Sequence, residues 1–145
     1  MTRYQEQISV DAPAGAIYDY VSDFGRHGEW SSNGLTVTAD GSGPEAVGST
    51  FSTTAKQFGT QKEHSTITEM SPGTTFAWQS KGALGLVNHR FDLSGDNPTQ
   101  VTKSADFVEP TYLAKATSFK LKKDVPAGLR SDLEKIKAHL ESPAT

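Results

Sequence analysis

The C-terminal part of the chain carries an apolar pattern that fits one long helix and requires a partner surface. Leu129, Leu133, Ile136 and Leu140 recur at alternating spacings of four and three residues, which places them on one helical face. Charged residues of the same stretch are expected on the opposite face: Arg130, Asp132, Glu134, Lys135 and Lys137. Because an apolar helix face must be buried, the rest of the chain should supply a sheet for it to cover.

The middle of the chain reads as a series of short strands. Runs that alternate polar and apolar residues, or that are rich in Ser, Thr and Phe, predict strands over residues 35–39, 48–58, 61–70, 74–80, 86–93 and 100–107. Turn residues such as Ser71-Pro72-Gly73 separate these segments. Tight turns between consecutive strands are typical of an antiparallel meander. Five or more such strands are expected, besides an N-terminal strand that ends at Val10.

The segment from Ile8 to Trp30 combines a strand end with helix starts. Asp11 can cap a helix, Pro13 suits its first turn, and a second short helical piece should follow the cap residues Ser22-Asp23. Gly25 and Gly28 are expected to limit that piece. Trp30 then lies just past its end, which suggests a place at the rim of an entrance.

These residues carry a resemblance to a known superfamily. The run Ala12-Pro13, Ile17-Tyr18, Val21-Ser22-Asp23 and Glu29-Trp30 is similar to the N-terminal signature of START/Bet v 1-like (SRPBCC) proteins, and most similar to the polyketide cyclase/dehydrase and lipid-transport type. The resemblance implies an α+β helix-grip fold. Such a fold has a curved antiparallel seven-stranded sheet, two short helices after strand 1, and a long C-terminal helix packed over a cavity.

The approach to the C-terminal helix is expected to be irregular. Tyr112, Ala116 and Phe119 repeat a helical spacing, so a helical lead-in should begin near Thr111. Pro126 cannot donate a backbone hydrogen bond and crowds the preceding turn, which predicts a break over residues 123–126. The lysines of this segment could meet an anionic head group or form a solvated face: Lys115, Lys120, Lys122 and Lys123.

Length, charge and cysteine count exclude several classes. The chain has 145 residues without a composition break, so we expect one START/Bet v 1-like domain over residues 1–145. It has no cysteine, which excludes a disulfide framework and a thiolate site. A net charge of −3 argues against nucleic-acid binding. The absence of an N-terminal signal pattern or an apolar run long enough to span a membrane predicts a cytoplasmic protein.

Motifs for metal or cofactor chemistry are absent from the sequence. The four histidines, His27, His64, His89 and His139, lack the spacing that puts two imidazoles on one ion. The chain also has no phosphate-binding glycine loop and no nucleophile elbow. We therefore expect neither a metal nor a cofactor.

Two titratable residues are candidates for acid/base catalysis. His89 shares a strand face with Phe91, and Glu63 shares one with Ser65 and Ile67. If both faces point inward, an imidazole and a carboxylate could move a proton next to a carbonyl group, as aldol cyclisation and dehydration require. The alternative is that His89 is a hydrogen-bonded inner-face residue and Glu63 points to solvent.

Aromatic residues are the candidates for ligand contact, either lining a pocket or filling the core instead. These residues are Trp30, Phe51, Phe76, Trp78, Phe91, Tyr112 and Phe119. The leading hypothesis is a protein that binds a small hydrophobic or aromatic ligand, polyketide- or lipid-like, in an internal cavity. The alternatives are a cyclase or dehydratase that uses His89 with Glu63 or Tyr112, and a protein-binding module like the co-chaperone-like relatives. We expect a monomer or a weak homodimer.

Overall fold

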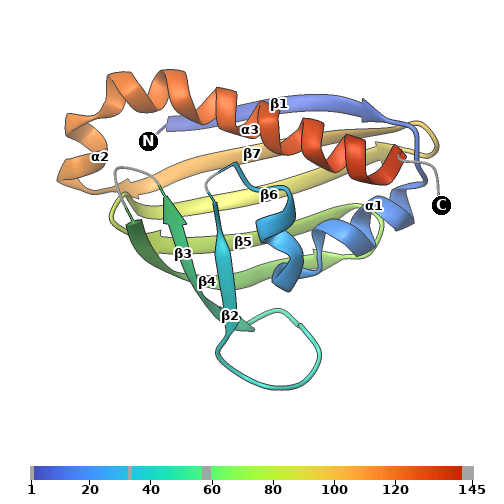
Figure 1. Cartoon of the computed structure of the whole chain (residues 1–145), viewed down its shortest axis with the longest axis horizontal. Helices are drawn as coiled ribbons and strands as arrows, with labels where there is room; N and C mark the ends of the chain where they lie inside the picture. The colour runs from blue at the N-terminus through green and yellow to red at the C-terminus, as the bar shows by residue number, and fades with distance from the viewer. Residues whose placement is uncertain (1, 33, 57–59, 142–145) are drawn as a thin grey trace.

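A computed structural model describes residues 2–32, 34–56 and 60–141 (Figure 1). The elements, in chain order, are β1 (Thr2–Val10), α1 (Ala14–Val21), the 3-10 helix η1 (Phe24–Glu29), β2 (Thr36–Ala39), β3 (Thr50–Lys56), β4 (Thr60–Ser71), β5 (Thr75–Gly82), β6 (Gly85–Gly95), β7 (Thr99–Pro110), α2 (Tyr112–Ala116) and α3 (Ser118–Glu141). The predicted α+β helix-grip fold is confirmed. Residues 57–59, which hold the end of the strand expected over 48–58, lie outside the described residues.

The sheet is one antiparallel layer. Its strand order is β1-β7-β6-β5-β4-β3-β2, so the first strand pairs with the last and the others follow as a meander. One inner face runs across the central strands because residues of a strand alternate between its two sides. Trp78 pairs with His89, and Phe91 pairs with Lys103, so these four side chains share that face.

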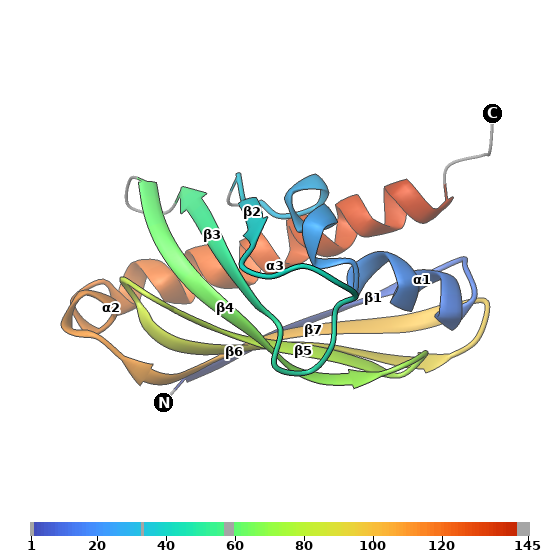
Figure 2. The same ribbon diagram turned by 90° about the horizontal axis from the view of Figure 1, so that it is seen from below.

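Helix α3 grips the sheet at its β1 edge. It lies over the same face as α1 and η1 (Figure 2). Arg130 Nη1 donates to the Gln7 carbonyl at 3.0 Å and Lys137 Nζ to the Ser9 carbonyl at 2.9 Å. These side chains satisfy carbonyl groups that an edge strand would otherwise leave open. In the described part of the chain, none of the helices is both long and apolar enough to cross a membrane.

The predicted break in the C-terminal helix is wrong. Helix α3 runs without interruption from Ser118 to Glu141 and contains Pro126. Leu121 and Leu129 are buried on either side of this proline, and their packing against the sheet outweighs the lost backbone hydrogen bond. The helical lead-in is α2, whose first turn is capped by the Thr111 side chain, which accepts from the Ala114 N–H.

Two local expectations near the N-terminus are also wrong. Asp11 does not cap α1; Asp96 Oδ1 accepts from the Ala14 N–H at 3.0 Å instead. Gly25 and Gly28 lie within η1 rather than limiting it. Long-range partners, which the local pattern does not reveal, supply the groups that these helix starts need.

The buried apolar residues form two clusters. The first, here called the aromatic cluster, packs α1 and η1 on the sheet and includes Phe24, Trp30, Phe51, Phe76, Trp78 and Phe91. The second, called the aliphatic cluster, lies under α2 and the first half of α3 and includes Leu84, Val87, Ala105, Phe107, Leu121 and Leu129. The site described next lies where the two clusters meet.

Candidate functional site

A cavity opens between α3 and the inner face of the sheet. It has two adjoining parts, of about 100 Å³ on the side of the aliphatic cluster and about 60 Å³ on the side of the aromatic cluster. Together they are called the central cavity. Five polar residues line both parts: Glu63, Ser80, His89, Lys103 and Asp132. The two parts thus share a polar stretch of wall, to which one part adds aliphatic side chains and the other aromatic ones.

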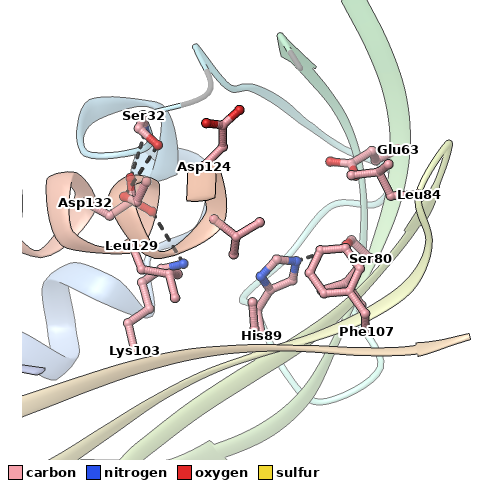
Figure 3. A pocket seen from close by; sticks show the side chains of 14 residues that line it. Ser32, Glu63, Ser80, Leu84, His89, Lys103, Phe107, Asp124, Leu129 and Asp132 are labelled. Atoms are coloured by element: carbon pink, nitrogen blue, oxygen red, sulfur yellow. Dashed lines mark hydrogen bonds and ion pairs between the residues drawn. The ribbon is translucent and has the colours of Figure 1, made fainter. Parts of the chain in front are cut away.

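A buried ion pair joins the sheet to the helix across this cavity. Lys103 on β7 points inward and its Nζ lies 3.4 Å from Asp132 Oδ2 on α3, with both side chains more than nine-tenths buried. Asp132 Oδ1 also accepts from the Ser32 N–H at 2.7 Å (Figure 3). A Cβ on Gly128 would come within 3.1 Å of Ser32 Oγ, so glycine permits this close approach.

Aromatic rings surround the Lys103 ammonium. Its Nζ lies 5.5 Å from the ring centres of Trp30 and Phe91 and 5.7 Å from that of Trp78. Burial lowers the pKa of Lys103, while the Asp132 carboxylate acts in the opposite direction. The ring faces and the carboxylate together favour the charged form inside an otherwise apolar setting.

His89 presents an unpaired nitrogen within the core. Its Nε2 lies 3.0 Å from Ser80 Oγ and its ring stacks on Trp78 at 5.0 Å between centres. Its Nδ1 is shielded from solvent and has no hydrogen-bond partner among the described residues. Burial, followed by the charge of Lys103, lowers the pKa of His89 well below its usual range. The imidazole is therefore neutral at pH 7.

Glu63 faces His89 and Lys103 from the far side of the cavity (Figure 3). Its side chain lies against Gly82, where a Cβ would come within 2.8 Å of Glu63 Cγ. Burial raises the pKa of this carboxyl group. His89 and Glu63, expected as inward-facing candidates, thus line one cavity from β6 and β4, and their catalytic role stays a prediction.

The structure separates the seven aromatic candidates into three groups. Trp30 and Trp78 line the central cavity, whereas Phe51, Phe76 and Phe91 are buried in the aromatic cluster. Trp30 is only 2% exposed, so its expected place at an entrance rim is wrong. The packing of η1 against the sheet encloses its ring.

Tyr112 and Phe119 lie elsewhere. Their exposed fractions are 86% and 79%, and neither lines the central cavity. Their helical spacing reflects α2 and the start of α3, whose buried residues are Ala114 and Leu121 instead.

Three polar residues of the interior were missed or misplaced by sequence reasoning. Asp132 was expected on the solvent face of α3 but is buried toward the cavity. Lys103 alternates with Val101 and Ala105 on the inner face of β7, and Asp132 sits three residues after Leu129 and four before Ile136. In both cases a charged residue occupies a position where the strand or helix pattern places an apolar one. Two such residues of opposite charge predict a buried ion pair.

His27 is the third of these residues. It is fully buried in η1, with Nε2 2.8 Å from the Val21 carbonyl and its ring stacked on Phe24 at 4.1 Å. Burial is the main cause that lowers the pKa of His27 to about 3. This neutral histidine lines the smaller part of the cavity. Over the described ranges, no three His, Asp or Glu side chains are grouped closely enough to hold a metal ion.

The fold and cavity define a class: helix-grip proteins that enclose a pocket between a curved sheet and a C-terminal helix. A family model described as polyketide cyclase / dehydrase and lipid transport matches residues 1–141. The chain belongs to that family, as its N-terminal signature predicted. Among curated protein sequences, no match was found.

Solved structures share the fold at low sequence identity. A protein from Chromobacterium violaceum is 11% identical with a TM-score of 0.75, and 99% of this chain aligns with 100% of that one. The Aha1 dimer from Colwellia psychrerythraea is 20% identical with a TM-score of 0.68, covering 97% of both chains. BexL, a di-domain ARO/CYC from the BE-7585A biosynthetic pathway, is 17% identical with a TM-score of 0.71, covering 99% of this chain and 51% of that one.

Proposed function

We propose that the central cavity binds a compact aromatic or polyketide-like molecule through an oxygen atom placed between Lys103 and His89. The observation that carries this proposal is the pairing of a buried ammonium with an unpartnered imidazole nitrogen on adjacent strands of one cavity wall. A Ser80 hydroxyl that donates to His89 Nε2 leaves the hydrogen on Nδ1, which then donates into the cavity.

The charges favour an oxygen acceptor on the ligand. Lys103 has three N–H donors, and Asp132 is the carboxylate within ion-pair distance. A carbonyl, phenolate or carboxylate oxygen can accept from a remaining ammonium hydrogen and from His89. The apolar side chains of Leu84, Val87 and Leu129 provide the surface for a hydrocarbon body.

The volume limits the size of the ligand. Drug-sized pockets measure roughly 300–1,000 Å³, whereas a cavity of about 150 Å³ holds a benzene ring. The larger part of the central cavity has about 100 Å³. Together with the adjoining part of about 60 Å³, this space approaches the size of a single ring, and a longer polyketide or lipid would require α3 to move away from the sheet. The ARO/CYC name of structural neighbours also supports an aromatic product or substrate.

The test uses the two tryptophans as reporters. Trp30 and Trp78 are the only tryptophans in the chain, and both line the central cavity. Titration with benzoate, followed by the ¹H–¹⁵N signals of the two indole groups, should shift both signals in a saturable way. Toluene, which has the ring but no oxygen, should bind at least tenfold more weakly.

The matched variant removes the Lys103 charge and its partner Asp132 together, so that neither charge is left buried alone. Lys103→Met combined with Asp132→Leu replaces both partners by apolar side chains of similar length, which is often neutral for stability. This variant should lose the preference for benzoate over toluene. Equal affinity of the original chain for the two probes would contradict the proposed oxygen site, and absence of shifts with both probes would contradict ligand binding in the cavity.

A second function, acid/base catalysis, is favoured by one observation. A neutral imidazole with an unpartnered Nδ1 and a carboxyl group with a raised pKa face the same cavity. In this role His89 would be the other tautomer, with Nε2–H donating to Ser80 Oγ and a bare Nδ1 as the base, or ionised Glu63 would be the base. The base would remove a proton next to a ligand carbonyl and Lys103 would stabilise the resulting enolate. The proton would then return to carbon or leave with a hydroxyl group as water.

Exchange of carbon-bound hydrogen tests this function directly. Acetophenone in D₂O is the probe, and the loss of its methyl proton signal gives the rate. The protein should accelerate exchange, and His89→Gln should remove at least nine-tenths of the acceleration. His64→Gln is the matched control because His64 lies on the surface beside Asp40. An unchanged rate in His89→Gln would eliminate His89 as the base.

A further inference from the structure

A short segment at one end of the molecule holds most of the exposed large apolar residues of the described chain. Four large apolar residues are exposed among the described residues: Val47, Tyr112, Leu113 and Phe119. Three of them fall between Tyr112 and Phe119. Clustered exposed aromatic side chains mark interaction surfaces, whereas single ones need no explanation.

The same segment concentrates positive charge. Residues 111–123 contain four lysines and no acidic residue, although the whole chain has a net charge of −3. Lys115, Lys122 and Lys123 are exposed, and Lys120 lies 3.6 Å from Asp124. The segment is therefore a basic and aromatic region on an otherwise acidic protein.

The backbone beneath this region is held in place. Ala114 and Leu121 are buried in the aliphatic cluster, and Thr111 Oγ1 donates to the Ala83 carbonyl at 2.6 Å. The inner face of α2 and of the first turns of α3 is thus already used for packing. The exposed aromatic residues are additional apolar surface on the outer face, at the end of the molecule opposite α1 (Figures 1 and 2).

We propose that this region, the α2–α3 face, docks on the surface of anionic phospholipid membranes. The face is defined by Tyr112, Leu113, Lys115, Phe119, Lys120, Lys122 and Lys123. Lysine ammonium groups would meet lipid phosphates and carboxylates, and the two aromatic rings would enter the boundary between head groups and acyl chains. Amphipathic helices with basic and aromatic side chains bind the boundary between lipid head groups and acyl chains in this way.

The position of the α2–α3 face connects it with the central cavity. Directly after Lys123, α3 contributes Asp124, Val125 and Gly128 to the cavity wall. Leu84 of the same wall lies in the β5–β6 turn, which Thr111 ties to the start of α2. Docking would therefore place this wall next to the lipid surface. The docking proposal stands whether or not the proposed ligand is correct.

Vesicle co-sedimentation tests the proposal. Vesicles of phosphatidylcholine with one quarter phosphatidylserine should bind the full chain at 0.1 M salt, and pure phosphatidylcholine vesicles should bind at least tenfold less. Tyr112→Ser with Phe119→Ser should weaken binding at least tenfold, and so should Lys122→Glu with Lys123→Glu. The matched control, Lys62→Glu with Lys81→Glu, changes two exposed lysines on β4 and β5 and should bind as the original does.

Three results would overturn the proposal. The first is no binding to the anionic vesicles. The second is a loss of binding in the lysine variant with none in the aromatic variant, since simple charge attraction would then suffice. The third is that Tyr112→Ser with Phe119→Ser converts a dimer to a monomer in analytical ultracentrifugation while vesicle binding is unchanged. The face would then be a contact between two copies of the chain.

Discussion

The two apolar clusters differ in how they use buried surface. In the aromatic cluster the rings fill the space between η1 and the sheet: Phe24 stacks on Phe51 at 4.3 Å, and Phe76 contacts Tyr18, Phe24, His27 and Trp78. In the aliphatic cluster the side chains are smaller and α3 crosses above them, which leaves the larger part of the central cavity. One end of the molecule is packed for stability and the other retains space.

The buried polar residues lie at the boundary between these ends. Lys103, Asp132 and His89 meet there with an unpaired nitrogen and with cavity on both sides. Buried ionic groups contribute little to stability compared with well-packed apolar residues. Their place at the boundary therefore supports the proposed recognition of a polar ligand group.

Truncation of a large side chain should show the largest difference between the two ends. Phe76→Ala in the aromatic cluster should lower the free energy of unfolding by about 3–5 kcal/mol, because the surrounding rings cannot close the gap. Leu129→Ala borders an existing cavity and should cost about 2 kcal/mol. Urea unfolding of both variants measures the difference, and equal losses would show that the two ends are packed alike.

Removal of one member of the buried ion pair should have the next largest effect. Asp132→Ala leaves the Lys103 ammonium buried without its carboxylate and should cost about 3–5 kcal/mol. The double variant Lys103→Met with Asp132→Leu should recover most of this loss, again by urea unfolding. If the double variant is as unstable as Asp132→Ala, the ion pair itself holds α3 on the sheet. That result would contradict the proposal that Lys103 and Asp132 serve ligand recognition.

Much of the fold could be predicted from the sequence, and the polar site only in part. The spacing of apolar residues predicted the strands and α3 because it shows which face of each is buried. Turn residues predicted where the strands end. The break at Pro126 was wrong because tertiary packing of Leu121 and Leu129 overrides a local preference. His89 and Glu63 were reached through strand alternation, but Lys103 and Asp132 required recognising that two charges on apolar faces could pair across the interior.

Acid should destabilise the packed end through His27. Its pKa of about 3 in the folded chain lies below the value near 6.5 of an unfolded histidine, so the unfolded state binds the proton more readily. The contribution of neutral His27 to the free energy of unfolding is fully present above pH 6.5. It falls as the pH decreases, by about 1.4 kcal/mol per pH unit. His89 acts in the same direction because its pKa is also lowered.

Urea unfolding between pH 7.5 and 5 measures this slope. His27→Gln should reduce it, whereas His64→Gln, whose side chain is 59% exposed, should leave it unchanged. A slope that is the same in all three proteins would mean that His27 is not held neutral in the folded state.

Filling the retained space should have the smallest effect on stability. Ala105 lines the larger part of the central cavity, so Ala105→Leu should change the free energy of unfolding by less than about 1 kcal/mol while abolishing benzoate binding. The matched control Ala12→Leu adds the same atoms beside the aromatic cluster and should cost about 1–3 kcal/mol. A large loss in Ala105→Leu would indicate that this space is not available to a ligand.

The claim that the central cavity is a ligand site is tested most directly by native mass spectrometry. The chain and its Ala105→Leu variant are produced in the source organism, purified gently, and then denatured to release any bound molecule. The account predicts a small oxygen-containing molecule bound to the original chain and absent from the variant. An original chain without bound mass, or the same mass on both proteins, would contradict it.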